Sequence, residues 1–339
     1  AVTELNLLGN LGSASYRQAG DLYGVILLPE SATGADIEAA RKLLIDRGAA
    51  DGATASDYFA AWYQRSDLVE FKSVNMTGVT HVQSSWNSTS LESFDAPLPS
   101  VINGSQAWYN CASLESFSSD LPSATSVTFA WCNNTSLSDF RTTDIKTCSN
   151  FTSAWQNCSA LTSFPAGAKL GTSAQNVNFQ DAWRSSGLTS FSTPLPTATN
   201  LRSAFEDAVS LVSFDSQLPL ATNALFAWDT CSSLTSFDVS LPSLTAMYRA
   251  WAGCSSLTDF SVNVFSNWNP QSISSGVFDF TWQGCTSLTA QSVENILTSI
   301  DASGKYATST GASGGPALAD AGIDITYNVA TGSLSAATN

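Results

Sequence analysis

Residues 218–237 read LPLATNALFAWDTCSSLTSF, and residues 241–260 read LPSLTAMYRAWAGCSSLTDF. The two stretches align position by position, with Leu218 matching Leu241, and share Leu-Pro, Ala-Trp, Cys, Ser-Leu-Thr and Phe. Self-similarity at a fixed period of about 20–50 residues is typical of solenoid proteins. A single unit of this length is too short to bury its own apolar residues, so identical units are expected to stack and form one continuous core.

The aromatic residue of the Ala-Trp pair recurs through most of the chain. A Leu follows it after five or six residues in ten units, the first at Leu68 and the last at Leu288. Nine of the ten Trp occupy this repeat position, and one Phe completes the set. Each stacked ring would bury about 150–250 Å², so this column would be the largest single contribution to the core. The predicted aromatic column consists of Trp62, Trp86, Trp108, Trp131, Trp155, Trp183, Phe205, Trp228, Trp251 and Trp282.

The remainder of the unit predicts its local structure. Leu-Thr-Ser-Phe is short and contains β-prone Thr and Phe, so it is expected to form a strand. The Pro of Leu-Pro cannot donate a ladder hydrogen bond, so the strand ends before it. The Ser or Thr after Pro can cap a short helical turn that carries Ala-Trp. Parallel strands lie about 4.8 Å apart, so ten coils would span roughly 45 Å.

The pattern A-W-x-x-C-x-S-L-T-S-F resembles the BspA-like leucine-rich repeat over residues 62–288, with Trp in place of the family's usual Phe. The resemblance implies a leucine-rich-repeat solenoid of about ten coils, each of about 23 residues. Together with the strand and the short helical turn predicted for each unit, the expected fold is completed by a small N-terminal α/β cap that covers the open end of the solenoid. Family members occur on bacterial and protist cell surfaces and in bacteriophage fibres, where they mediate attachment.

The expected function is therefore a non-enzymatic phage virion fibre, or receptor-binding or host-attachment protein, at the virion surface or outside the cell. A bacterial cell-surface adhesin and a structural filament or capsid-decoration protein are the alternatives.

Four regions follow from the repeat and its flanks. Residues 1–60 are predicted to form the N-terminal cap or attachment region, and residues 61–290 the solenoid. Residues 291–300 are predicted to be a C-terminal capping helix, because an open solenoid end would expose core. Residues 301–339 are rich in Gly, Ser, Thr and Ala, which favours a flexible tail.

Charge and hydropathy exclude several classes of partner. The formal net charge is −15, which repels nucleic-acid phosphates and anionic lipid head groups. No apolar run approaches the roughly 20 residues of a membrane-spanning helix, so neither nucleic-acid binding nor membrane insertion is expected. The expected partners are a glycan or protein receptor on a host surface, other virion proteins, and further copies of the chain, with a trimer as the favoured oligomer.

A Cys follows the column aromatic by three residues in five units, and we call these residues the cysteine column. Disulfide formation between adjacent coils, such as Cys231 with Cys254, and metal binding are alternatives to a structural role. The structural role is favoured, because buried free thiols behave as small apolar groups. His81 has no Cys or acidic residue at ligand or triad spacing, so no catalytic, cofactor or metal site is predicted. The cysteine column consists of Cys111, Cys158, Cys231, Cys254 and Cys285.

The two residues between each repeat Leu and Phe are nearly always small and polar. Stacked coils would align them as a flat strip of hydroxyl and carboxylate groups that could bind glycan hydroxyls. The alternative is that they only keep an exposed parallel sheet soluble. This candidate exposed strip consists of Thr162, Ser163, Thr189, Ser190, Thr235, Ser236, Thr258 and Asp259.

Overall fold

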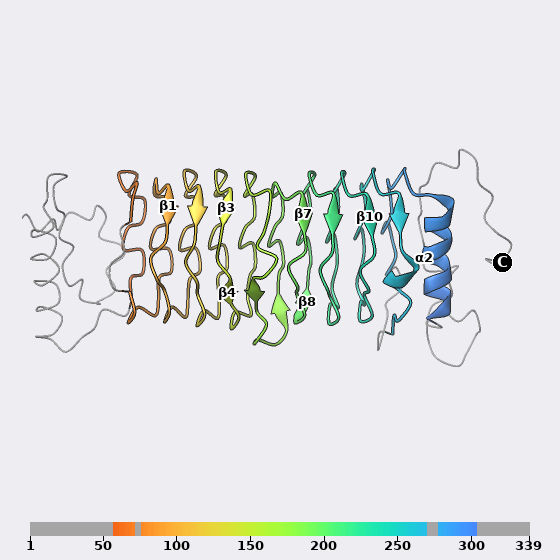
Figure 1. Cartoon of the computed structure of the whole chain (residues 1–339), viewed down its shortest axis with the longest axis horizontal. Coiled ribbons are helices and arrows are strands. Elements are labelled where there is room, and N and C mark those ends of the chain that lie inside the picture. Colours follow the sequence, from red (N-terminus) through yellow and green to blue (C-terminus); the bar gives the residue numbers. More distant parts are fainter. Residues whose placement is uncertain (1–56, 72–75, 270–276, 304–339) are drawn as a thin grey trace, which may run out of the picture. The chain divides into compact units, whose positions relative to one another are not determined.

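A computed structural model describes residues 57–71, 76–269 and 277–303, and these residues form a parallel β-solenoid of stacked coils with the period of the sequence repeat (Figure 1). The predicted solenoid architecture is therefore confirmed. Most of the predicted N-terminal cap, residues 1–56, and most of the predicted tail, residues 304–339, lie outside the described residues.

One side of the coils carries two-residue strands at the Ser-Phe or Asp-Phe step of the repeat. In each of these strands the Phe is buried and the preceding residue is at least partly exposed. Neighbouring strands pair in parallel and in register, so that Phe94 lies opposite Phe117, and Phe237 opposite Phe260. The strands are β1 (Ser93–Phe94), β2 (Ser116–Phe117), β3 (Asp139–Phe140), β7 (Ser190–Phe191), β9 (Ser213–Phe214), β10 (Ser236–Phe237) and β11 (Asp259–Phe260).

Further parallel pairing lies elsewhere on the coils. Strand β4 (Asp144–Ile145) pairs with β5 (Lys169–Leu170), and β6 (Val177–Asn178) pairs with β8 (Ala198–Asn200). The second pair belongs to a ladder of bridges five residues before the column aromatic, a position that is Asn in several coils.

This Asn ladder joins turn geometry to stacking. The side chain of Asn200 accepts a hydrogen bond from the Arg202 N–H at 3.1 Å, which is the bond of an Asx turn. Its Nδ2 donates to Asn178 Oδ1 of the neighbouring coil at 2.8 Å. One amide side chain therefore fixes the corner of its own coil and the register with the next.

The predicted short helical turn around the column aromatic is wrong, because a run of overlapping β-turns occupies those positions. The Ser85 N–H donates to the Val82 carbonyl at 3.1 Å, within its own coil, whereas the Trp86 N–H donates to Ala107 of the next coil at 2.8 Å. The same alternation recurs along the stack. In a helix all of these N–H groups would donate to carbonyls of the same coil. In the turn run every second N–H donates to a carbonyl of the neighbouring coil, which adds hydrogen bonds between coils.

The turn run requires an unusual backbone. The residues two before and two after the column aromatic have φ between +51° and +79° in every described coil. A positive φ at the third residue is the feature of a type II turn, which glycine adopts most easily. Most of these positions are not glycine, so the intercoil bonds hold the backbone in a conformation that side chains disfavour.

Helix is scarce in the part of the chain that the structure describes, where it is confined to the one-turn η1 (Val262–Val264) and to α2 (Ala290–Ala302). The predicted capping helix, residues 291–300, lies within α2. This helix buries Val293, Ile296 and Ile300. Its Asn295 Nδ2 donates to the Phe260 carbonyl at 3.0 Å, and Ser292 Oγ accepts from the Phe260 N–H at 2.9 Å. The helix therefore covers the last strand and pairs backbone groups that an open sheet edge would leave unpaired.

Candidate binding surfaces

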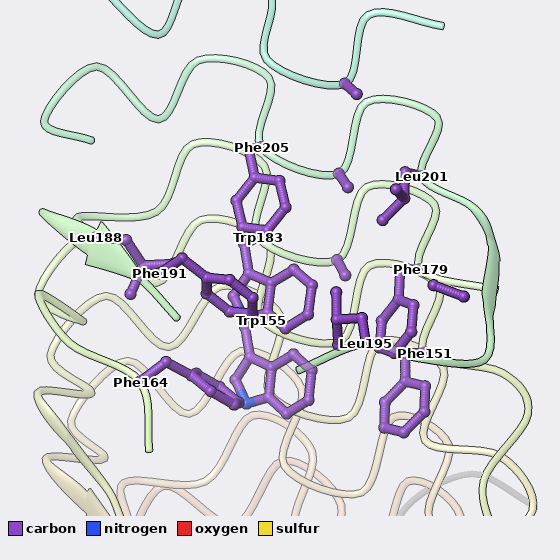
Figure 2. Packing of buried hydrophobic residues seen from close by; sticks show 14 of the residues in the cluster. Phe151, Trp155, Phe164, Phe179, Trp183, Leu188, Phe191, Leu195, Leu201 and Phe205 are labelled. Carbon is purple, nitrogen blue, oxygen red and sulfur yellow. The ribbon is translucent and has the colours of Figure 1, made fainter. Parts of the chain in front are cut away.

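The ten residues of the aromatic column stack face to face in one file, as Figure 2 shows for Trp155, Trp183 and Phe205. Neighbouring ring centroids are 5.0–6.4 Å apart, and the rings are inclined by only 1–9°. From Trp86 onwards every member has no exposed surface, whereas Trp62, in the first described coil, is half-buried. The column is therefore core, and its rings are not available to a ligand.

A second file of rings, formed by the repeat Phe, lies against the aromatic column. Each Phe meets its column aromatic at 4.7–5.2 Å between centroids and 60–89° between planes. The indole nitrogens of eight buried column Trp have no hydrogen-bond partner. Figure 2 shows the Trp155 nitrogen beside the Phe164 ring. Edge-to-face packing gives such an N–H a weak π acceptor, which offsets part of the cost of burying it unpaired.

The cysteine column is buried and has one recurring partner. Each Sγ lies 2.9–3.1 Å from the backbone carbonyl of the column aromatic in the preceding coil. All seven cysteines are free and buried, so the structure contains no disulfide between Cys231 and Cys254. Burial raises the pKa of the thiols of Cys158, Cys231 and Cys254, which keeps them protonated and unreactive.

The metal alternative has no supporting geometry in the described ranges, where no group of three or more His, Cys, Asp or Glu side chains is placed to hold an ion. His81 is exposed, and its Nδ1 lies 3.0 Å from Thr80 Oγ1. Its backbone forms a parallel bridge with Asn103, so His81 occupies the position of the Asn ladder. The structure therefore gives this residue a place in the repeat and brings no carboxylate or thiol to it as a hydrogen-bond or ion-pair partner.

All eight residues of the exposed strip are exposed, and the Leu and Phe on either side of each pair are buried. Three of the four threonine hydroxyls already donate a hydrogen bond to the preceding coil. Thr189 Oγ1 donates to the Thr162 carbonyl at 3.1 Å, Thr235 Oγ1 to the Val212 carbonyl at 3.2 Å, and Thr258 Oγ1 to the Thr235 carbonyl at 3.1 Å. The exposed serine hydroxyls have no such partner among the described residues, so the strip can offer a ligand both donors and acceptors.

Sequence reasoning missed a groove on the outer side of the turn run. It has a volume of about 300 Å³ and is lined mainly by Gln180, Asp181, Arg184, Arg202, Glu206 and Phe226. These residues come from three successive coils and lie one to three residues away from the column aromatic of each coil. The available signal was a departure from the repeat: the position two before the column aromatic is small or polar in most coils, but is Phe in three coils, at Phe129, Phe226 and Phe280.

The groove holds both signs of charge. Arg184 lies 3.1 Å from Glu206 and at longer range from Asp181 (3.7 Å) and Asp207 (3.8 Å). Arg202 is exposed and forms no ion pair with any other described residue. The groove therefore presents one free guanidinium beside carboxylates that are already partly neutralised.

The described helices include none long and apolar enough to cross a membrane. The family models, the curated proteins and the solved structures to which we compared this chain gave no match.

Proposed function

We propose that this chain is a non-enzymatic attachment protein, a leucine-rich-repeat array of about ten coils that serves as a fibre or receptor-binding protein at a phage virion surface. The observation that carries the proposal is the regular exposure, complete or partial, of the two residues between the buried Leu and the buried Phe in the coils from Leu91 to Phe260. This repetition places a mostly polar pair at the same repeat position in successive coils, which suits an extended ligand on a cell surface better than a small substrate.

The many links between neighbouring coils also support this proposal, because they make the solenoid rigid. Parallel ladders, the turn run and the Asn ladder link neighbouring coils at several points around each coil. A surface presented on such a scaffold loses little conformational entropy on binding. Attachment proteins benefit from this, because binding energy is then not used to order the surface.

The first experiment asks whether the full-length chain binds cells. Fluorescently labelled protein is mixed with a panel of bacterial strains, and the bound fraction is measured by flow cytometry. We expect saturable binding to some strains, and binding to none would count against attachment. Detection of the chain by mass spectrometry in purified phage particles distinguishes a virion protein from an adhesin of the cell surface.

A second experiment tests the exposed strip itself. The double variant Ser190→Arg and Ser236→Arg places two long side chains on exposed positions of the strip, where the serine hydroxyls form no hydrogen bond with any other described residue. If the strip contacts the receptor, cell binding falls, whereas unchanged binding shows that another face of the solenoid makes the contact. The third function class, a filament or capsid-decoration protein, predicts self-association or particle binding without cell binding.

A further inference from the structure

The groove beside the turn run combines an aromatic wall with paired donors and acceptors. Phe226 forms one wall, Arg202 supplies a free guanidinium, and Asp181 and Glu206 supply carboxylates. We propose that this groove, rather than the exposed strip, is the receptor-binding site of the attachment protein, and that it binds a neutral glycan chain with Phe226 packed against a sugar ring. The inference rests on the proposed attachment function and names its ligand class.

Phe226 contacts Tyr248 of the next coil but is not part of the buried core. Its φ is +57°, a conformation that costs a residue with a Cβ about 1–2 kcal/mol. At the same repeat position Ser153 and Ser203 are buried, whereas Phe226 is only partly buried and lines the groove. Every described coil has a positive φ at this position, so the departure at Phe226 lies in its side chain: a large, partly exposed ring stands where most coils have a small or polar residue.

The aromatic wall continues along the stack beyond the groove. Phe226 packs edge to face against Tyr248 at 5.4 Å and 68°, and Tyr248 packs against Phe280 at 5.6 Å and 80°. Phe280 is 39% exposed. The three rings come from successive coils, so they form a platform that suits several units of a chain better than one isolated small molecule.

The polar groups of the groove select for hydroxyl groups. A guanidinium only donates hydrogen bonds and a carboxylate only accepts them, whereas a sugar hydroxyl does both. Neighbouring hydroxyls can therefore accept from Arg202 and donate to Glu206 or Asp181. A neutral ligand also leaves the Arg184–Glu206 pair, at 3.1 Å, intact.

Charge disfavours an anionic glycan. Three carboxylates, Asp181, Glu206 and Asp207, surround Arg184, and Arg202 is the one further cation that lines the groove in the described structure. The charged residues that line the groove are two carboxylates and two guanidinium groups, which sum to zero, on a chain whose formal net charge is −15. A uronic-acid or sialylated chain would therefore gain no net attraction from the groove and would meet repulsion from the chain as a whole.

The test is affinity gel electrophoresis of the full chain in gels that contain dextran, mannan, galactan or, as the anionic arm, polygalacturonate. The variant Phe226→Ser introduces the residue that Ser203 places at the same repeat position with φ +52°, so the coil should keep its fold. The matched control is Phe129→Ser, which makes the same change at the same position outside the groove. Thermal unfolding followed by circular dichroism checks that all variants are folded.

We expect the wild-type chain to be retarded by at least one of the neutral polysaccharides. Phe226→Ser should weaken that binding about tenfold, which is the loss expected for one aromatic contact, and Phe129→Ser should leave it within about twofold. Arg202→Gln should weaken binding as well. Retardation by polygalacturonate alone, by no neutral polysaccharide, or equally for Phe226→Ser and wild type would overturn the assignment.

The cell-binding assay separates this inference from the function on which it rests. If wild type and Phe226→Ser bind cells equally, attachment stands and the groove is not the site. If wild type binds no cells, the attachment function fails and the assignment of a receptor site fails with it, whatever the gels show.

Discussion

Replacing Trp155 tests whether the aromatic column holds the coils together. Trp155 stacks on Trp131 and Trp183 with centroids 5.2 and 5.3 Å away, and it meets Phe164 edge to face at 4.9 Å. Trp155→Ala removes all of these contacts and opens a cavity in the middle of the column. We expect it to lower the free energy of unfolding by about 3–5 kcal/mol.

Trp155→Phe should cost far less, about 2 kcal/mol at most, because two effects oppose each other. A smaller ring keeps the stack, as Phe205 does at 5.0 Å from Trp183 and 6.4 Å from Trp228. The substitution also removes an indole N–H that has no hydrogen-bond partner and whose burial costs about 1–3 kcal/mol. The matched control is Trp268→Phe, because the Trp268 Nε1 donates to the Leu244 carbonyl at 2.8 Å and its loss leaves that carbonyl unpaired. Trp268→Phe should therefore cost more than Trp155→Phe.

The assay is urea unfolding followed by circular dichroism, together with hydrogen exchange of amides in the coils on either side. Exchange is included because a solenoid can lose individual coils without unfolding as a whole. A cost below about 1 kcal/mol for Trp155→Ala would refute the view that stacked indoles are the main source of cohesion. Equal costs for Trp155→Phe and Trp155→Ala would refute the account of the unpaired N–H.

Three further predictions concern the loss of stability at alkaline pH, the close contact between Gly187 and Ser159, and the Asn ladder. Burial raises the pKa of Cys148 to about 12, against about 8.5 in an unfolded chain, so the contribution of this thiol to stability should be full below about pH 8.5 and fall as the pH rises toward 12, by up to about 1.4 kcal/mol per pH unit, in addition to the losses from the other buried thiols. Urea midpoints between pH 8 and 10 should fall less steeply for Cys148→Ala. Gly187→Ala would place a Cβ 2.0 Å from the Ser159 carbonyl oxygen and should cost at least about 2 kcal/mol in thermal unfolding, whereas Gly78→Ala, with no atom within 4 Å, should change little. Asn200→Ala removes bonds of 3.1 and 2.8 Å and should cost about 1–2 kcal/mol in urea unfolding, and a smaller loss would show that the ladder is dispensable.

The sequence predicts the core of this solenoid well, because burial recurs with the repeat. Each predicted ring from Trp86 onwards and each predicted cysteine is buried, and the strands form at the Phe step of the repeat. The turn run was not predictable in the same way. A helical turn and a run of β-turns both bury the Ala-Trp pair, and the bonds that decide between them, such as Trp86 to Ala107, join residues of different coils. Local propensity contains no information about such partners.

The groove could not be predicted from the sequence for a related reason. Its residues are ordinary for a surface, and only stacking brings Asp181, Arg202 and Phe226 from three coils to one place. The repeat still contained a signal, since Phe226 places a large aromatic ring at a position that is small or polar in most coils. A position-by-position comparison of the units would find it, whereas a search for motifs within one unit would not.

The many Ser and Thr residues of this chain also take on a different meaning once the coils are stacked. Their hydroxyls repeatedly donate to a carbonyl of the preceding coil, as Thr222 does to Thr199 at 3.1 Å and Ser216 does to Thr193 at 2.7 Å. A residue that is needed for such an intercoil bond is not free to change for recognition. The residue type can vary at positions where the side chain is at the surface and bonds no carbonyl of another coil. The outer positions of the turn run are of this kind. Aromatic and charged residues gather at those positions around Arg184, so a ligand-binding surface can arise where the backbone is constrained by the turn run but the side chains are not required for intercoil bonds.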